Sequence, residues 1–155
     1  MKPYLLVYFL TLISFSMSHV YGKENVDLVE NAKSEHFQVG QVWHYKTRKT
    51  ETGSLLIIGK IDKNKNLGLI IHVKLVGLLI KNKSQKNGYS SFLGHIPIHE
   101  KALVASVTSM SNTKISLNRF AEGYKTWRTA FEKGRAGVFN IKVSEAVAAI
   151  EKAIN

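Results

Sequence analysis

The sequence contains no cysteine, only two prolines, and half as many acidic as basic side chains. Without cysteine the chain can form no disulfide, no thiolate metal site and no cysteine nucleophile. A domain of about 150 residues buries roughly two-thirds of the surface that its unfolded chain exposes, so it requires neither bridges nor a metal. The stability of the fold is therefore expected to come from packing.

Acidic side chains are scarcest after residue 36. Residues 37–155 carry 19 basic and 7 acidic side chains, a net charge of +12. A field of this sign favours anionic partners, and outside the cytoplasm these are acidic proteins or anionic envelope components more readily than nucleic acid; solubility alone is the simpler explanation. Asp62, the one aspartate of this stretch, lies in a lysine-rich turn and is predicted to be solvated. Paired catalytic carboxylates are therefore not indicated.

The first 22 residues have the order of a secretory signal. Lys2 is followed by an apolar run from Leu5 to Phe15 and by a small-residue exit that ends at Gly22. The run is about half of the roughly 20 residues that a membrane-spanning helix needs. We expect a bacterial source, cleavage after Gly22, a periplasmic or secreted product and no transmembrane span in the mature protein; an uncleaved anchor is the alternative.

Periodicity predicts strands in the first half of the chain. The polar segment 23–36 is expected to be a flexible lead-in or a short helix before the domain proper, residues 37–155. Apolar and polar residues then alternate, as is typical of half-buried strands, in segments 41–47 and 69–75. Segment 54–61 is an apolar run between two turn-like stretches, which predicts a strand that forms a hairpin with its neighbour. Gly77 indicates a bulge, and the Asn87-Gly88 turn leads to a further short strand.

Helical spacing begins after Pro97. A first short helix is predicted from Ile98 or His99 to about Val107, a second ending at Gly134, and a third capped by Ser144. Four aromatic side chains of the second helix form one stripe that we expect in the core: Phe120, Tyr124, Trp127 and Phe131.

Strands followed by helices predict an α+β fold. We expect one domain with a small, mostly antiparallel sheet in the N-terminal half, open or coiled into a partly open barrel. About three helices follow and pack on one side of the sheet. The order of the strands is not readable from the sequence.

Known catalytic motifs are absent: there is no phosphate-binding glycine loop, no nucleophile elbow and no paired-histidine zinc helix. His95 and His99 flank Pro97, which argues against an i, i+4 ligand pair on one helical face. No catalytic residue, metal ligand or cofactor is assigned.

A candidate binding surface comes from strand alternation. In one strand His44 and Lys46 alternate with apolar residues, His72 and Lys74 do so in another, and Lys60 belongs to the polar phase between them. If the strands are neighbours, these five side chains share one open cationic face: His44, Lys46, Lys60, His72 and Lys74. A solvated face is the simpler interpretation; the functional one is a docking surface for an anion, strengthened below about pH 6.5 as histidines protonate.

Several segments together resemble a family of small uncharacterised bacterial proteins. The resemblance is carried by Val39-Gly40-Gln41-Val42-Trp43-x-Tyr45-x-Thr47-Arg48, Leu67-Gly68-x-Ile70-x-His72-Val73, Gly123-Tyr124-x-x-Trp127-Arg128-x-Ala130-Phe131 and Ala136-Gly137-Val138-Phe139-x-Ile141. It covers most of the chain after the signal. It implies a bacterial source and a single domain, and no activity is established for the family.

The leading functional hypothesis is an exported, non-enzymatic binding protein that presents this cationic face to an acidic partner. One alternative is an inhibitor or immunity-type protein that blocks an enzyme, for which small size and export are equally expected. The other is an enzyme with an unfamiliar site near His95 and His99. A deep pocket lined by His95, His99 or Glu100 would favour the enzyme.

Overall fold

The structure, a computed structural model, describes residues 28–155; the predicted signal peptide, residues 1–22, lies outside the described residues. In chain order the elements are β1 (Val29–Asn31), β2 (Val42–Tyr45), β3 (Leu55–Asn64), β4 (Gly68–Lys81), β5 (Tyr89–His99), α1 (Glu100–Val104), β6 (Val107–Ser111), α2 (Phe120–Phe131) and α3 (Val143–Ile154).

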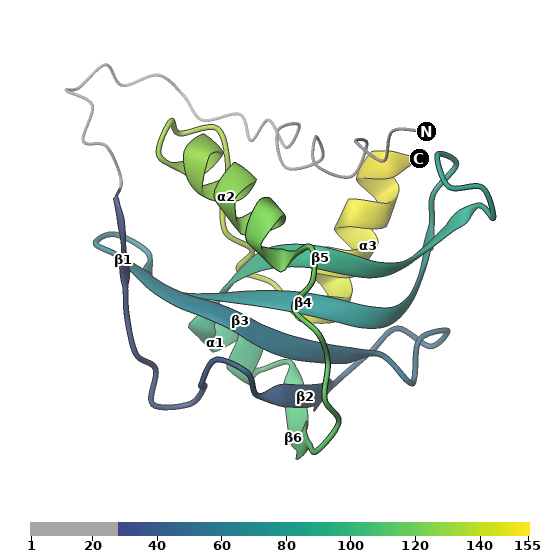
Figure 1. Cartoon of the computed structure of the whole chain (residues 1–155), viewed down its shortest axis with the longest axis horizontal. Helices are drawn as coiled ribbons and strands as arrows, with labels where there is room; N and C mark the ends of the chain where they lie inside the picture. Colours follow the sequence, from purple (N-terminus) through teal and green to yellow (C-terminus); the bar gives the residue numbers. More distant parts are fainter. Residues whose placement is uncertain (1–27) are drawn as a thin grey trace.

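The strands form one open antiparallel sheet with the order β5-β4-β3-β2-β6 (Figure 1). β2 to β5 are joined as successive hairpins, and β6 returns to pair with β2. β1 and β2 share one edge of β3, β1 at Asp62–Asn64 and β2 at Leu55–Ile57. The predicted α+β class is confirmed, and the sheet does not close into a barrel.

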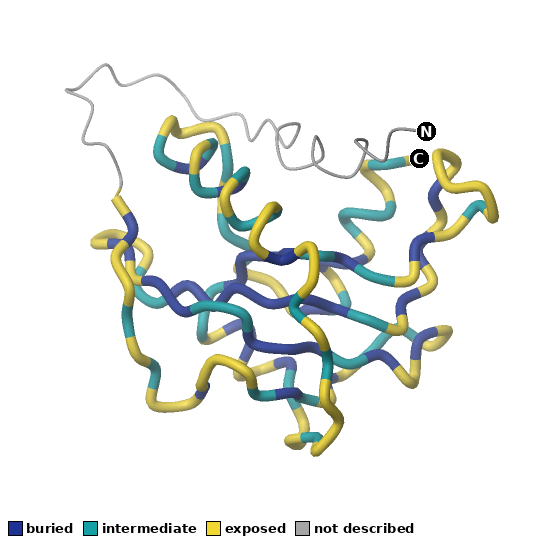
Figure 2. Tube along the Cα trace, viewed as in Figure 1, coloured by how far each residue is buried: buried dark blue, intermediate teal, exposed yellow. Residues whose placement is uncertain are grey.

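Helices cover both faces of the sheet, whereas the sequence predicted one side. Ile71, Val73 and Leu75 of β4 belong to the larger core, which α1 and α3 complete with Leu103 and Val147. The opposite face of β4 carries Ile70, which packs with Trp127 and Phe131 of α2 in a second core. In Figure 2 the central strands are accordingly buried along most of their length.

Three local predictions are wrong. The third helix begins at Val143 with Lys142 as its N-cap residue, so Ser144 lies inside the helix and does not cap it. The lead-in contains β1 rather than a helix, because Val29 is buried in the second core and its strand pairs with the free edge of β3. The first helix ends at Val104, and Val107 to Ser111 form β6 instead, because their backbone completes the edge of β2.

The aromatic stripe lies on α2 as predicted. Phe120, Trp127 and Phe131 are buried, and Tyr124 is half-buried. Within residues 28–155 no helix is long and apolar enough to cross a membrane.

Candidate functional site: a buried histidine pair and a cationic hollow

The sheet face predicted to be open is largely covered by α2. The strand register pairs Lys60 with His72 and Ile57 with Lys74, so the polar residues of β3 and β4 do share one face. However, His72 is 0% and Lys74 5% exposed. The prediction of an open face is therefore wrong at these two residues. The aromatic rings of α2 lie over His72, and the segment before α2 covers Lys74, whose ammonium group donates to oxygens of Ser116 and Asn118.

The outer end of the face remains partly open. Its register places one row across four strands: His44, Leu55, Val76 and Phe92. His44 and Lys46 are exposed, and the other three members of the row are partly exposed. Of the five predicted residues, His44 and Lys46 therefore remain on the surface. Lys60 is partly exposed beside Asp62 and donates to Asn31.

Under α2 lies a chain of buried polar side chains. The Tyr124 hydroxyl donates to Oδ2 of Asp62 at 2.6 Å. The same oxygen lies 3.3 Å from Nε2 of His72, an ion-pair contact that is not aligned as a hydrogen bond. Nδ1 of His72 lies 2.9 Å from Nε2 of His95, and the two rings are nearly parallel. We call His72 and His95 the histidine pair.

The proton positions in this chain follow by elimination. Nε2 of His72 faces a carboxylate, which favours a proton on that nitrogen. Nδ1 of neutral His72 is then an acceptor, and Nε2–H of His95 is its donor. Nδ1 of His95 is left as a buried lone pair that accepts no hydrogen bond from residues 28–155.

Burial determines the ionisation of these groups. Burial lowers the pKa of His72, and the carboxylate of Asp62 only partly opposes this effect. Burial also lowers the pKa of His95 well below its usual range, and the neighbouring His72 lowers it further. For Asp62 burial raises the pKa, but His72 and the Tyr124 hydroxyl outweigh it and hold the pKa below its usual value. At neutral pH the buried group formed by Tyr124, Asp62 and the histidine pair thus contains one carboxylate and two neutral imidazoles.

The histidine pair is sealed by aromatic rings rather than open to a substrate. The ring of His72 contacts Tyr124 and Trp127, and the ring of His95 contacts Phe120 as well. Gly123 of α2 passes so close that an added Cβ would lie 2.7 Å from the Cβ of His95. His95 is accordingly only 7% exposed. A general base needs reach to its substrate, which this packing denies.

His99 lies apart from this chain. It follows His95 by four residues on the same strand, a separation of about 13 Å at strand spacing, and its backbone N–H donates to Phe139. Among residues 28–155 no group of three or more potential metal-ligating side chains comes together.

A cationic hollow opens where the row of exposed residues meets the start of α2. Its volume is about 390 Å³, and it is lined by Lys74, Val76, Gly77, Ser91, Phe92, Asn118 and Arg119. None of these lining residues is acidic, and neither His95, His99 nor Glu100 is among them. Both cations lie near the Phe92 ring: its centroid is 5.8 Å from Nζ of Lys74 and 5.6 Å from Cζ of Arg119.

The two cations of the hollow are held differently. Lys74 uses its ammonium protons on the carbonyl oxygens of Ser116 and Asn118 and on the Asn118 side chain. Burial lowers its pKa, and the nearby Arg119 lowers it further. Within the described chain, no hydrogen bond or ion pair engages the guanidinium of Arg119. The guanidinium is therefore available as a charged donor to a ligand.

Arg119 also has an unusual backbone. Its φ of 62° is left-handed, and it is the non-glycine residue with positive φ in the described chain. This conformation costs a non-glycine residue roughly 1 kcal/mol, and glycine would adopt it freely.

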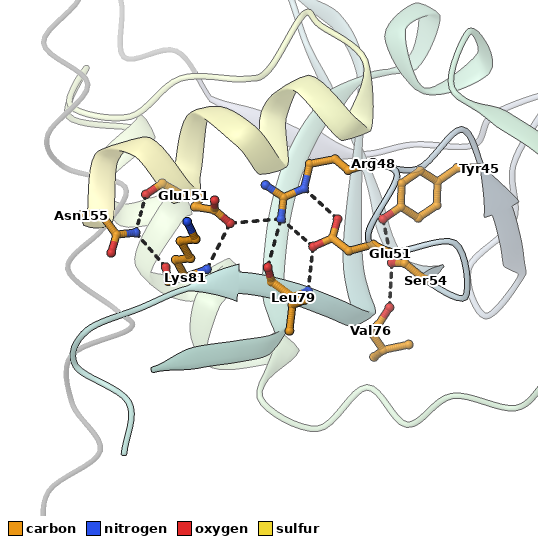
Figure 3. Close-up of polar contacts among 9 residues, drawn as sticks. All are labelled: Tyr45, Arg48, Glu51, Ser54, Val76, Leu79, Lys81, Glu151 and Asn155. Atoms are coloured by element: carbon orange, nitrogen blue, oxygen red, sulfur yellow. Dashed lines mark hydrogen bonds and ion pairs between the residues drawn. The ribbon is translucent and has the colours of Figure 1, made fainter. Parts of the chain in front are cut away.

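A third polar cluster fastens the far end of the sheet (Figure 3). Arg48 donates to both carboxylate oxygens of Glu51, at 2.6 and 2.8 Å, and to Glu151 of α3 at 3.1 Å. Glu51 also accepts from the Leu79 backbone, and Glu151 from that of Lys81. We call Arg48, Glu51 and Glu151 the clamp. Both carboxylate oxygens of Glu51 and Oε2 of Glu151 accept hydrogen bonds from within the fold, which favours a structural role for the clamp.

The sequence predictions missed Asp62 and Tyr124. Asp62 is 1% exposed rather than solvated, because β3 continues to Asn64 and passes under Tyr124. The available signal was the phase of the strand: Asp62 and Lys60 alternate with buried Ile61. That phase identified the face and did not reveal that α2 covers it.

The search of family models, of curated proteins and of solved structures found no match to this chain.

Proposed function

We propose that this protein is an exported, non-enzymatic binding module that takes an acidic segment of a partner protein into the cationic hollow. The observation that carries the proposal is the unpartnered guanidinium of Arg119, at the rim of a hollow with a second cation and no carboxylate. Carboxylates are the groups that a guanidinium binds most directly.

The floor of the hollow favours a protein segment over a purely ionic polymer. Phe92, Val76 and the adjoining Leu55 offer apolar surface beside the two charges. A segment that places a Glu or Asp next to an apolar side chain would satisfy both. His44, in the same row, lies about 10 Å from Val76 at strand spacing and adds a polar side chain to this surface.

The conformation of Arg119 supports a role in binding. Arg119 occupies a left-handed position that glycine would adopt without the energetic cost. The presence of arginine there suggests that its side chain is needed. Binding and folding therefore make opposite demands at this position. The alternative of an enzyme near His95 and His99 has no comparable support, because the histidine pair is sealed.

The test separates these two demands with the Arg119→Gly variant. We expect the variant to be more stable than wild type, with a free energy of unfolding about 1 kcal/mol higher. We expect it to bind an acidic probe about tenfold more weakly, because one charge-assisted hydrogen bond is lost. The probe is a capped hexapeptide of alternating Glu and Leu, titrated against the ¹⁵N-labelled protein. Backbone shifts should concentrate at Lys74, Ser91 and Phe92.

The matched control is Lys125→Gln, which removes one exposed charge from the outer side of α2. It should bind the probe as wild type does. Equal weakening by both variants would replace the proposal with general charge attraction. Equal binding of a Gln-Leu probe would contradict it altogether. Retention on anionic vesicles that neither variant changes would point to the envelope as the partner, and one saturable enzyme partner to the inhibitor alternative.

A further inference from the structure

We propose that the histidine pair is an acid-operated latch: when His72 and His95 take up protons, α2 is released from the sheet while the rest of the fold persists. The inference concerns the conformation of the protein and does not depend on the function of the hollow.

The buried group formed by Asp62, His72 and His95 can accommodate one added proton but not two. The 2.9 Å contact between the two imidazoles needs one N–H and one lone pair. A first added proton can be shared along the chain, because Asp62 is its counter-ion at 3.3 Å from His72. A second proton sets N–H against N–H and places two positive rings in contact. Asp62 can compensate only one of them.

The second step is the charge around the pair. The titratable and charged side chains that face it are Asp62 and Lys60 from β3, Lys74 from β4, and Tyr124 and Arg128 from α2. Asp62 is the one carboxylate in this set, and three of the others are cations. The surroundings therefore offer no further compensation for a doubly charged pair.

The third step is access to water. A charged imidazole that lacks a counter-ion must be hydrated. Gly123 leaves no layer for water over His95, and Trp127 and Tyr124 close over His72. Water reaches the pair only when α2 moves away from the sheet.

The connections of α2 allow it to leave the sheet while the strands stay paired. α2 is joined to the fold by the irregular segments 112–119 and 132–142, so it can leave without breaking a strand. The larger core lies on the opposite face of the sheet and contains neither histidine. The contacts of α2 that are lost include those of the second core and the packing of Phe120 on His95 and Gly59. Three hydrogen bonds are lost with them: Tyr124 to Asp62, Trp127 to Gly137 and Arg128 to the Val29 carbonyl.

The lowered pKa values of His72 and His95 agree in direction with this scheme. Both histidines bind protons more readily in the released state than in the closed state. The closed state is therefore favoured above about pH 6.5, the ordinary value for histidine, and loses ground as the pH falls below it. Because the two rings share one hydrogen bond, they titrate as a coupled unit.

The experiment measures the fluorescence of Trp127, whose ring contacts both histidines, in a Trp43→Phe background that removes the other tryptophan. We expect its emission to shift to the red on acidification below pH 6.5, with a Hill coefficient near 2, while the amide signals of β3 and β4 stay dispersed. His95→Gln keeps a donor for His72 without the charge, and should move the midpoint at least one pH unit lower. His44→Gln, at an exposed histidine, should leave the midpoint unchanged.

A second measurement keeps the test valid if His95→Gln does not fold. Imidazole ¹⁵N shifts of the wild-type protein should show His72 and His95 neutral at pH 7.5, with protons on Nε2, and charged once Trp127 is exposed. The latch is refuted if either ring is already charged at pH 7.5 with Trp127 buried. The latch is also refuted if the Trp127 emission shift and the loss of the dispersed β3 and β4 amide signals have the same pH midpoint. It is refuted as well if His95→Gln does not change the midpoint of the emission shift.

Discussion

At the scale of single residues, three glycines determine how closely α2 approaches the sheet. A Cβ at Gly59 would lie 2.3 Å from the ring of Phe120, and one at Gly94 would lie 3.1 Å from the Arg119 carbonyl oxygen. Gly123 has the same role from the helix side, against His95. The missing side chains let aromatic rings, rather than water, surround the histidine pair.

Gly123→Ala tests this close packing. In an exposed helix the change would stabilise by about 1 kcal/mol through helix propensity. Here we expect a loss of about 1–3 kcal/mol, because the new methyl group must displace either α2 or β5. Urea unfolding measures the difference. Gly137→Ala, where an added Cβ meets nothing within 4 Å, should stay within about 0.5 kcal/mol of wild type; a similar loss at both positions would contradict the packing argument.

At the scale of elements, the clamp joins three parts of the chain that are far apart in sequence. Arg48 and Glu51 belong to the connection between β2 and β3, and Glu151 to α3. Both carboxylates bind backbone N–H groups of β4 as well (Figure 3). Ser54 adds a bond to the Val76 carbonyl and accepts one from Tyr45. The pairing of β3 with β4 ends at Val76, although β4 continues to Lys81. Beyond Val76, side chains of the clamp bind the edge of β4 that β3 leaves free.

Arg48→Met should show the strength of this connection. The side chain of Glu51 is 1% exposed, so removal of its partner leaves a buried carboxylate without a counter-charge. We expect a loss of about 2–3 kcal/mol in the free energy of unfolding, at the lower side of the range for fully buried pairs because Arg48 is partly exposed. The neighbouring Lys49→Met removes an exposed charge and should cost less than about 0.5 kcal/mol. Equal effects would mean that the clamp contributes nothing specific.

At the scale of the whole molecule, ionisable side chains limit stability on both sides of neutral pH. On the acid side, the proposed latch limits the stability of the closed state, in which α2 lies on the sheet. Two tyrosines set the alkaline limit. Burial raises the pKa of Tyr45 to about 12 against the opposing Ser54 bond, and burial and the Asp62 carboxylate raise that of Tyr124 to about 12.

The alkaline limit should appear between pH 10 and pH 12. Because the folded-state pKa of Tyr45 lies above the unfolded value near 10, its contribution is present below pH 10 and is lost as the pH rises towards 12. The slope is at most about 1.4 kcal/mol per pH unit for Tyr45, and less for the half-buried Tyr124. Urea unfolding across this range measures it. Tyr45→Phe should flatten the slope and exposed Tyr89→Phe should not; an unchanged slope in Tyr45→Phe would contradict the assignment.

Some features followed from the sequence because they depend on near neighbours along the chain. Strand alternation located the hairpins from β2 to β4, and helical spacing located α2 with its buried aromatic stripe. The register of the sheet confirmed that Lys60, His72 and Lys74 share one face. These are local periodicities, which a short segment determines by itself. The predicted export, the resemblance to a bacterial family and the acidic partner stay predictions.

The tertiary structure alone decided what covers that face. An aromatic stripe must be buried, but its spacing does not indicate the surface against which it packs. The stripe of α2 packs against the sheet face that the sequence analysis predicted to be open. The same packing buried Asp62, brought Tyr124 to it from 62 residues away and sealed the histidine pair. Exposure is a property of the assembled fold, because each residue is buried by segments far from it in sequence.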